Sequence, residues 1–152
     1  MKEMDKKKLT LSAAMIVLLP LLSALINTGY VLAVRAITPT PDIVAQGVGR
    51  IIFFCIPAAL IIYYGYRTGD KITSTLSGVF FFPLFNFYSG IPFRSLIPFL
   101  RYWLSWKGFL DLAPPVLIFG LLGYFASRRT KASLVVAIAL GIFIILMFLG
   151  ID

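Results

Sequence analysis

Six polar side chains interrupt otherwise apolar stretches of this chain, and their types suit ligand binding: Asn27, Arg50, Asn86, Arg94, Arg101 and Asp111. Four of them lie at similar distances from the basic residue that ends a predicted span: Asn27 is 19 residues from Lys8, Arg50 is 17 from Arg67, Asn86 is 15 from Lys71 and Asp111 is 17 from Arg128. At 1.5 Å per residue these separations are about 22 to 29 Å. The four side chains are therefore predicted to share one layer toward the outer side of a membrane.

Arg50 and Asp111 carry opposite charges at matched depth. A charge in hydrocarbon is costly without a partner, so we expect this pair to face the bundle interior. With the two asparagines, and with Arg94 and Arg101 as a cationic rim, the layer predicts an outward-opening cavity for an anionic or polar small molecule. The alternative is that these side chains reach the headgroups and hold helices together.

Catalytic and cofactor chemistry has little support in the residue types present. The chain has no His and a single Cys, Cys55, so haem, zinc and an internal disulfide relay are not expected. Asp111 is the only carboxylate within a predicted span, which leaves no carboxylate pair for acid–base work. We expect no cofactor, no metal and no enzymatic activity, and a lipid-modifying enzyme using Asp111, Arg94 and Arg101 is the weaker alternative.

Composition indicates a membrane protein. Of the 152 residues, 60% are hydrophobic and 13% are charged, whereas soluble domains are about half apolar and a quarter charged. The net charge of +8 is spread over segment ends and loops rather than gathered in one block. Anionic lipid headgroups explain this charge better than nucleic acid does, and no nucleic-acid partner is expected.

The apolar stretches predict an all-α, integral membrane helical bundle in a single transmembrane domain, residues 9–152, preceded by a basic tail, residues 1–8. A spanning helix needs about 20 apolar residues. Five spans are expected, at residues 9–34, 44–66, 72–91, 109–127 and 132–151. The first is read as a retained helix, although a basic tail before an apolar run is also typical of a signal peptide.

Residues 92–108 interrupt the spans and are rich in cations and aromatic side chains. Arg94, Arg101 and Ser105 are spaced by seven and four residues, which predicts one shared helical face. Trp103 and Trp106 lie roughly opposite. This arrangement favours a segment in the membrane interface, and a re-entrant segment is the alternative.

Orientation follows from the distribution of Lys and Arg. With the N-terminus inside, nine basic residues lie on the inner side: Lys2, Lys6, Lys7, Lys8, Arg67, Lys71, Arg128, Arg129 and Lys131. Five lie on the outer side: Arg35, Arg50, Arg94, Arg101 and Lys107. This distribution predicts a multi-pass cell-membrane protein with a cytoplasmic N-terminus and an external C-terminus.

Two further patterns concern packing. Pro57 and Gly65-Tyr66 have the same spacing as Pro115 and Gly123-Tyr124, which is consistent with a repeated hairpin or with ordinary spanning-helix composition. The aromatic side chains from Phe80 to Tyr88 cover all sides of their helix, so we expect them to contact lipid or a partner.

Two functions stay open at this point. The polar layer and the prolines within the spans favour a solute-binding or transport component. Small size and many surface aromatics favour a non-catalytic structural or accessory subunit of a membrane complex. The expected partners are the bilayer, its anionic headgroups and other membrane subunits.

Overall fold

A computed structural model describes residues 11–37, 43–90, 101–102 and 104–149, with backbone alone described at 43–48, 50–51, 90 and 148–149. Helix makes up 94% of the described residues and no strand occurs among them, which confirms the all-α class. The elements in chain order are η1 (Ala14–Leu18), α2 (Leu19–Ile37), α3 (Ile43–Thr68), α4 (Lys71–Gly90), α6 (Trp106–Ser127) and α7 (Lys131–Leu149).

The first helix changes its winding next to a proline. η1 is a π-helical stretch that continues directly into α2, so residues 11–37 form one unbroken helix. Pro20 cannot donate the hydrogen bond that the Ile16 carbonyl would otherwise accept, and its ring crowds that carbonyl. A wider π turn at this place relieves the crowding, as π-bulges do elsewhere in helices.

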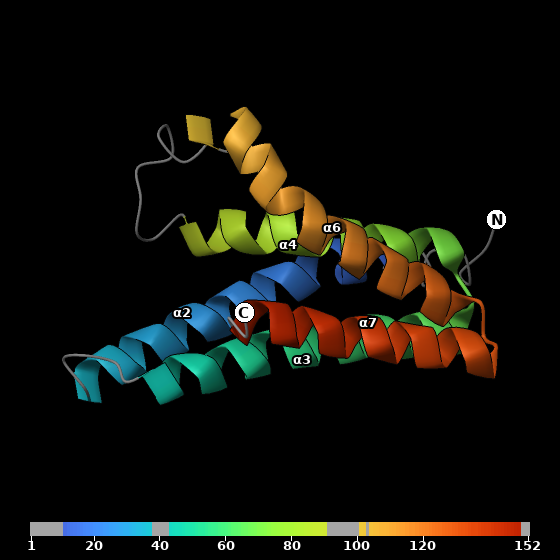
Figure 1. Ribbon diagram of the computed structural model, residues 1–152, viewed down its shortest axis with the longest axis horizontal. Coiled ribbons are helices and arrows are strands. Elements are labelled where there is room, and N and C mark those ends of the chain that lie inside the picture. Colours follow the sequence, from blue (N-terminus) through green and yellow to red (C-terminus); the bar gives the residue numbers. More distant parts are fainter. Residues whose placement is uncertain (1–10, 38–42, 91–100, 103, 150–152) are drawn as a thin grey trace.

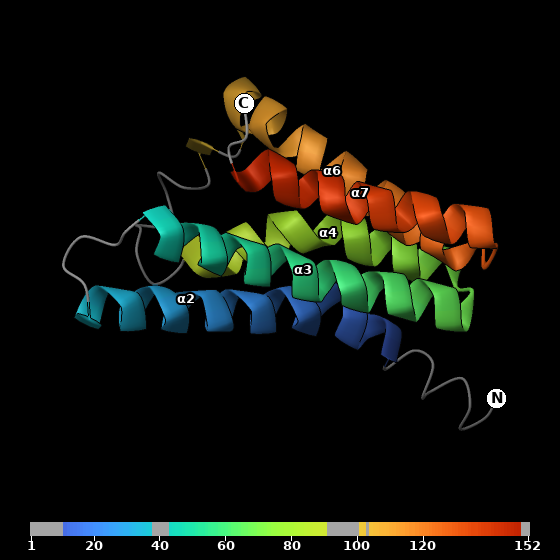
Figure 2. The same ribbon diagram turned by 60° about the horizontal axis from the view of Figure 1, so that its bottom comes forward.

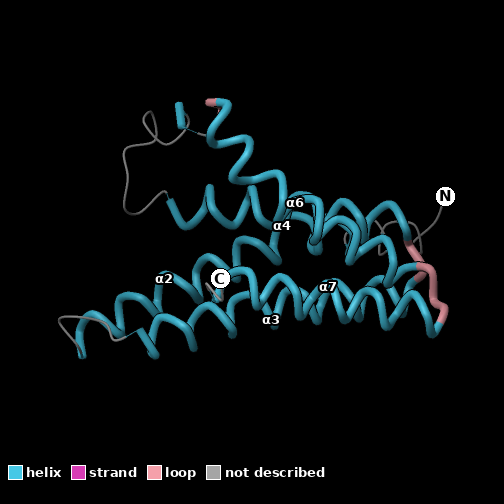
Figure 3. Tube along the Cα trace, in the orientation of Figure 1, coloured by secondary structure: helices cyan, strands magenta, loops and turns pink. Residues whose placement is uncertain are grey.

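The helices run roughly along one long axis, and short turns join them at one end of the molecule (Figures 1 and 3). The α3–α4 turn and the α6–α7 turn both lie at this end. At the opposite end the first turns of α6 tilt away from α2 and α3, and two views show the same divergence (Figures 1 and 2).

The tightest packing is between α4 and α6. A Cβ added at Gly78 would lie under 3.0 Å from the Phe119 carbonyl oxygen, and one added at Gly123 would lie as close to the Ser74 carbonyl oxygen. Only glycine permits this approach of two backbones, as at small-residue contacts in membrane helix pairs. The Ser74 hydroxyl, fully buried, donates a hydrogen bond of 2.9 Å to the Gly123 carbonyl.

Phenylalanines fill the core beside this crossing. Phe81 and Phe119 are fully buried with ring centroids 4.9 Å apart, and Phe54, Phe82 and Phe85 pack around them. The expectation that the whole Phe80–Tyr88 cluster contacts lipid or a partner is therefore wrong for Phe81, Phe82 and Phe85, which are buried within this chain. Six aromatic residues among the nine positions from Phe80 to Tyr88 cover all sides of the helix, so the pattern alone does not show which side another helix will bury.

Two of the described helices are long and apolar enough to cross a membrane: Leu11–Ile37, with mean hydropathy 2.0, and Trp106–Ser127, with mean hydropathy 1.7. Within α3 and α7, the stretches Ile52–Thr68 and Lys131–Met147 are shorter apolar helices. Each predicted span overlaps a described helix, and residues 9–10, 91 and 150–151 of the predicted spans lie outside the described residues. That all five cross a bilayer stays a prediction.

The segment before α6 differs from its predicted form. Residues 92–100 and 103, most of the predicted interfacial segment, lie outside the described residues. Ser105 has an extended backbone, and its hydroxyl caps α6 by accepting from the Gly108 N–H at 3.1 Å. The helical face predicted to join Arg101 to Ser105 is thus wrong, because the chain leaves helical geometry at Ser105 and Trp106 begins α6.

Candidate functional site

The two short turns at one end of the bundle are joined through Arg129. Its guanidinium donates hydrogen bonds to the carbonyl oxygens of Tyr66, at 3.1 Å, and Arg67. These carbonyls are among the last of α3 and have no partner within their own helix. Arg129 has φ of 57°, a left-handed conformation, and faces Gly69 with φ of 66°. A cation at the negative end of α3 is also electrostatically favourable.

The end of the bundle that holds these turns is strongly basic. Its charged side chains in the turns and at the adjoining helix ends are Arg67, Lys71, Arg128, Arg129 and Lys131, with Asp70 as the carboxylate among them. Asp70 caps α4, because its carboxylate accepts from the Thr73 N–H at 3.1 Å and from the Thr73 hydroxyl at 3.0 Å. Arg67, Arg128 and Lys131 have exposed side chains.

Hydroxyl groups extend this basic end into the bundle. The Thr73 hydroxyl lies 3.1 Å from that of Ser12, which in turn lies 3.5 Å from the Tyr64 hydroxyl. This chain of hydroxyls links the first helix to α3 and α4. It is short and satisfied by its own members, so we interpret it as a structural link.

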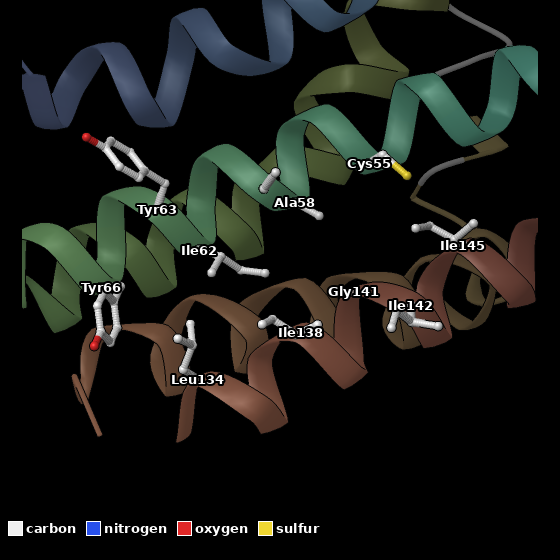
Figure 4. A pocket seen from close by; sticks show the side chains of 11 residues that line it. Cys55, Ala58, Ile62, Tyr63, Tyr66, Leu134, Ile138, Gly141, Ile142 and Ile145 are labelled. Atoms are coloured by element: carbon white, nitrogen blue, oxygen red, sulfur yellow. The ribbon is translucent and has the colours of Figure 1, made fainter. Parts of the chain in front are cut away.

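A groove lies between α3 and α7 and begins near the same basic end (Figure 4). Its cavity volume is about 490 Å³, and it is open to the side of the bundle. Its lining is almost wholly apolar: Cys55, Ala58, Ala59, Ile62, Tyr63, Tyr66, Leu134, Ile138, Gly141, Ile142 and Ile145. Figure 4 shows Tyr66 near Leu134 at one end, and Cys55 near Ile145 at the other.

The sequence produces this groove by placing small residues on facing helix surfaces. Cys55, Ala58 and Ala59 recur at helical spacing on α3, and Gly141 lies opposite on α7. A Cβ added at Gly141 would meet its nearest neighbour, a Leu122 methyl group, at 3.5 Å, so there is room for a side chain. The reactive groups in this wall are the half-buried Cys55 thiol and the Tyr63 and Tyr66 phenols, and the rest of the lining is aliphatic, which suits an apolar ligand.

Asp111 has a described partner that the sequence analysis did not anticipate. Its carboxylate accepts a hydrogen bond from the Tyr102 hydroxyl, and both residues are exposed. This bond, together with the negative charge of Asp111, raises the pKa of the Tyr102 phenol above its usual value of 10.0. Tyr102 and Asp111 are nine residues apart, on opposite sides of the extended residue Ser105. Helical periodicity therefore did not reveal the pair.

The other members of the predicted polar layer are not brought together within the described residues. The Asn86 side-chain amide donates at 3.0 Å to the Phe82 carbonyl of its own helix. Asn27 is half-buried in α2, and Arg101 is exposed. The Arg50 side chain and the whole of Arg94 lie outside the described part of the chain. The pairing of Arg50 with Asp111, and the cavity built on it, therefore stay predictions.

Comparison of the chain with protein-family models, curated proteins and solved structures finds no match.

Proposed function

We propose that this chain is a five-span integral membrane protein of the cell membrane, with a cytoplasmic N-terminus and an external C-terminus. We further propose that it acts as a non-catalytic accessory component. In this role its α3–α7 face binds another constituent of the bilayer. The observation that carries the proposal is the laterally open, apolar groove between α3 and α7.

Helix lengths support the placement in a membrane. α3 has 26 residues, α4 has 20, α6 has 22 and α7 has 19. At 1.5 Å per residue these helices are about 28 to 39 Å long, close to the roughly 30 Å of a hydrocarbon core.

Exposed side chains support it independently. On α2, Leu25 is 60% exposed, and on α7, Val135 is 66% exposed. Monomeric soluble proteins rarely present such large apolar side chains in continuous patches, whereas lipid-facing helices do.

The groove supports a binding role more than a catalytic one. Its lining offers apolar contact and two exposed tyrosine rings, Tyr63 and Tyr66. No group of three metal-ligating side chains occurs among the described residues, and the groove walls carry no carboxylate. An apolar recess on the lipid-facing side of a bundle binds most favourably a hydrocarbon chain or an apolar side chain that matches its shape.

Native mass spectrometry after gentle extraction tests this function. We expect the chain to be recovered with a bound membrane constituent, and Gly141→Leu to lose it because a leucine side chain fills the groove. The matched control is Gly29→Leu, since nothing lies within 4 Å of a Cβ added at Gly29. Recovery of the wild-type chain with nothing bound, and with Gly141→Leu indistinguishable from it, would contradict the proposal.

A solute-binding or transport role is the second candidate, and one observation favours it. Asp111 is exposed and held by Tyr102 at the end where α6 tilts away from α2 and α3 (Figure 1). In this role Asp111→Asn and Arg50→Ala abolish binding of an anionic or polar solute. Unchanged solute binding or uptake in both variants would contradict it.

A further inference from the structure

We propose that the α3–α7 groove binds one acyl chain of an anionic phospholipid from the cytoplasmic leaflet, with the lipid's headgroup held at the basic end of the bundle. This inference rests on the proposed function, because it needs the basic end to lie on the cytoplasmic side. It adds the chemistry of the ligand and the residues that select it.

The length of the groove matches one leaflet. Its α3 wall runs from Tyr66 to Cys55 and its α7 wall from Leu134 to Ile145, and in each wall the end residues are eleven positions apart. At 1.5 Å per residue each wall is about 16 Å long. Half of a hydrocarbon core of about 30 Å is about 15 Å. A groove that begins at the basic end therefore reaches the middle of the bilayer, as one acyl chain does.

The cross-section of the groove selects the kind of occupant. A volume of about 490 Å³ over about 16 Å gives a cross-section of about 30 Å². An α-helix is 10–12 Å across with its side chains, so a helix would lie over this groove rather than within it. A single hydrocarbon chain has no backbone polar groups to satisfy and fits an almost wholly apolar, narrow recess.

The basic end supplies charge complementary to a phosphate. Lys131 begins α7 one turn before Leu134, so the two side chains share a face that leads into the groove. On α3, Arg67 follows the groove residue Tyr66 and lies four residues after Tyr63. Both cations are exposed. Arg129 is engaged with the end of α3, Arg128 lies over the Tyr124 ring, and Lys71 belongs to α4, whereas Arg67 and Lys131 adjoin the two helices that form the groove.

The two tyrosines complete the match to an interface. Tyr63 is 66% exposed and Tyr66 is 39% exposed, and both are among the lining residues nearest the basic end, where Figure 4 shows Tyr66 beside Leu134. Tyrosine is favoured at this depth of a membrane because its ring is apolar and its hydroxyl polar. Cytoplasmic leaflets carry anionic lipids that attract lysine and arginine near the surface.

The test uses the full chain in bilayers of equal parts phosphatidylglycerol and phosphatidylethanolamine, followed by native mass spectrometry. We expect one phosphatidylglycerol to be retained in preference to phosphatidylethanolamine. The double variant Arg67→Gln/Lys131→Gln should weaken this preference about fivefold for each cation removed. Lys107→Gln is the matched control, because Lys107 is an exposed cation in the first turn of α6, away from the groove.

Cys55 provides a second measurement within the same chain. It is the only cysteine, and it lines the far end of the groove. Phosphatidylglycerol should slow its alkylation by a maleimide several-fold relative to phosphatidylethanolamine alone. The protection should be reduced in the double variant, whose exposed substitutions leave the core intact.

The outcomes separate this inference from the proposed function. Equal retention of the two lipids, with Cys55 equally protected in both, would overturn the anionic-lipid assignment. Retention of a second copy or another protein, released by Gly141→Leu, would also overturn it. In all these cases the groove would still bind a membrane constituent. A chain with nothing bound and with Cys55 unprotected in either lipid would overturn both.

Discussion

The hydrogen bond from the Tyr102 phenol to the Asp111 carboxylate links the two sides of the extended residue Ser105. A phenol that donates to a carboxylate loses this bond when it ionises, and the new negative charge is then repelled by Asp111. Both effects raise the pKa of Tyr102 above 10.0. The stabilising contribution is therefore complete below pH 10.0 and is lost as the pH rises through the raised pKa.

The effect of the Asp111 carboxylate on the pKa of Tyr102 can be tested by tyrosine titration. The ultraviolet difference between wild type and Tyr102→Phe isolates the tyrosinate signal of Tyr102 from that of the other tyrosines. In an Asp111→Asn background the pKa obtained in this way should fall toward 10.0. If Tyr102 titrated identically in the wild-type and Asp111→Asn backgrounds, the carboxylate would not be the cause.

Two buried serine hydroxyls allow a matched test of hydrogen bonding. The Ser74 hydroxyl donates across helices to the Gly123 carbonyl. The Ser89 hydroxyl is buried and has no hydrogen-bond partner among the described residues. Ser74→Ala should lower the free energy of unfolding by about 0.5–1.5 kcal/mol, whereas Ser89→Ala should be neutral or slightly stabilising. Thermal unfolding in detergent micelles measures both, and equal losses would contradict the assignment.

At the scale of elements, α4 and α6 depend on two glycines for their close approach. Gly78→Ala and Gly123→Ala each place a Cβ against a backbone carbonyl that cannot move aside easily. We expect each substitution to cost about 1–3 kcal/mol of unfolding free energy, the usual range for overpacking.

The control for this prediction is Gly29→Ala on α2, where an added Cβ meets nothing within 4 Å. This variant should unfold at the wild-type temperature or slightly above it. If Gly78→Ala and Gly29→Ala were equally stable, the close α4–α6 contact would be wrong.

The two Gly-Tyr pairs noticed in the sequence have related packing roles. Gly65 on α3 lies against the Ser74 hydroxyl, and Gly123 on α6 lies against the Ser74 carbonyl. The equal spacing thus corresponds to two helices that both approach α4 at one serine. This is a packing relation, and a repeated hairpin stays a prediction.

Helix positions followed from the sequence because apolar runs and charged turns determine them locally. Which side of each helix is buried did not follow from the sequence. Phe80 and Phe81 are adjacent and of the same type, yet Phe80 is 43% exposed and Phe81 is fully buried. The groove also needed three-dimensional information, because Cys55 and Gly141 meet only through the packing of α3 on α7. Small residues at helical spacing were the available signal.

For the candidate site, the sequence singled out Asp111 as a carboxylate within a predicted span, but it did not indicate Tyr102 as a hydrogen-bond partner. The two residues lie on opposite sides of the break at Ser105, and a helical spacing argument does not extend across an extended residue. The basic turns were anticipated from their charges. Their contact through Arg129 depends on how two hairpins lie side by side.

Across the bundle as a whole, the basic turns and the groove both bear on the proposed membrane placement. The turns at one end carry five cations and Asp70, and this excess is typical of a cytoplasmic side. The groove begins at that end, so its proposed lipid comes from the cytoplasmic leaflet. Both the proposed function and the proposed lipid site therefore depend on the topology.

Single-cysteine labelling with a membrane-impermeant maleimide tests this topology most directly. In a Cys55→Ala background, Leu104→Cys marks the end of the bundle near Tyr102, and Ala132→Cys marks the basic end. Both positions are exposed, and neither substitution removes a charge. In right-side-out vesicles we predict labelling at position 104 and protection at position 132, with the reverse in inverted vesicles. Labelling of both positions from the same side would contradict the account.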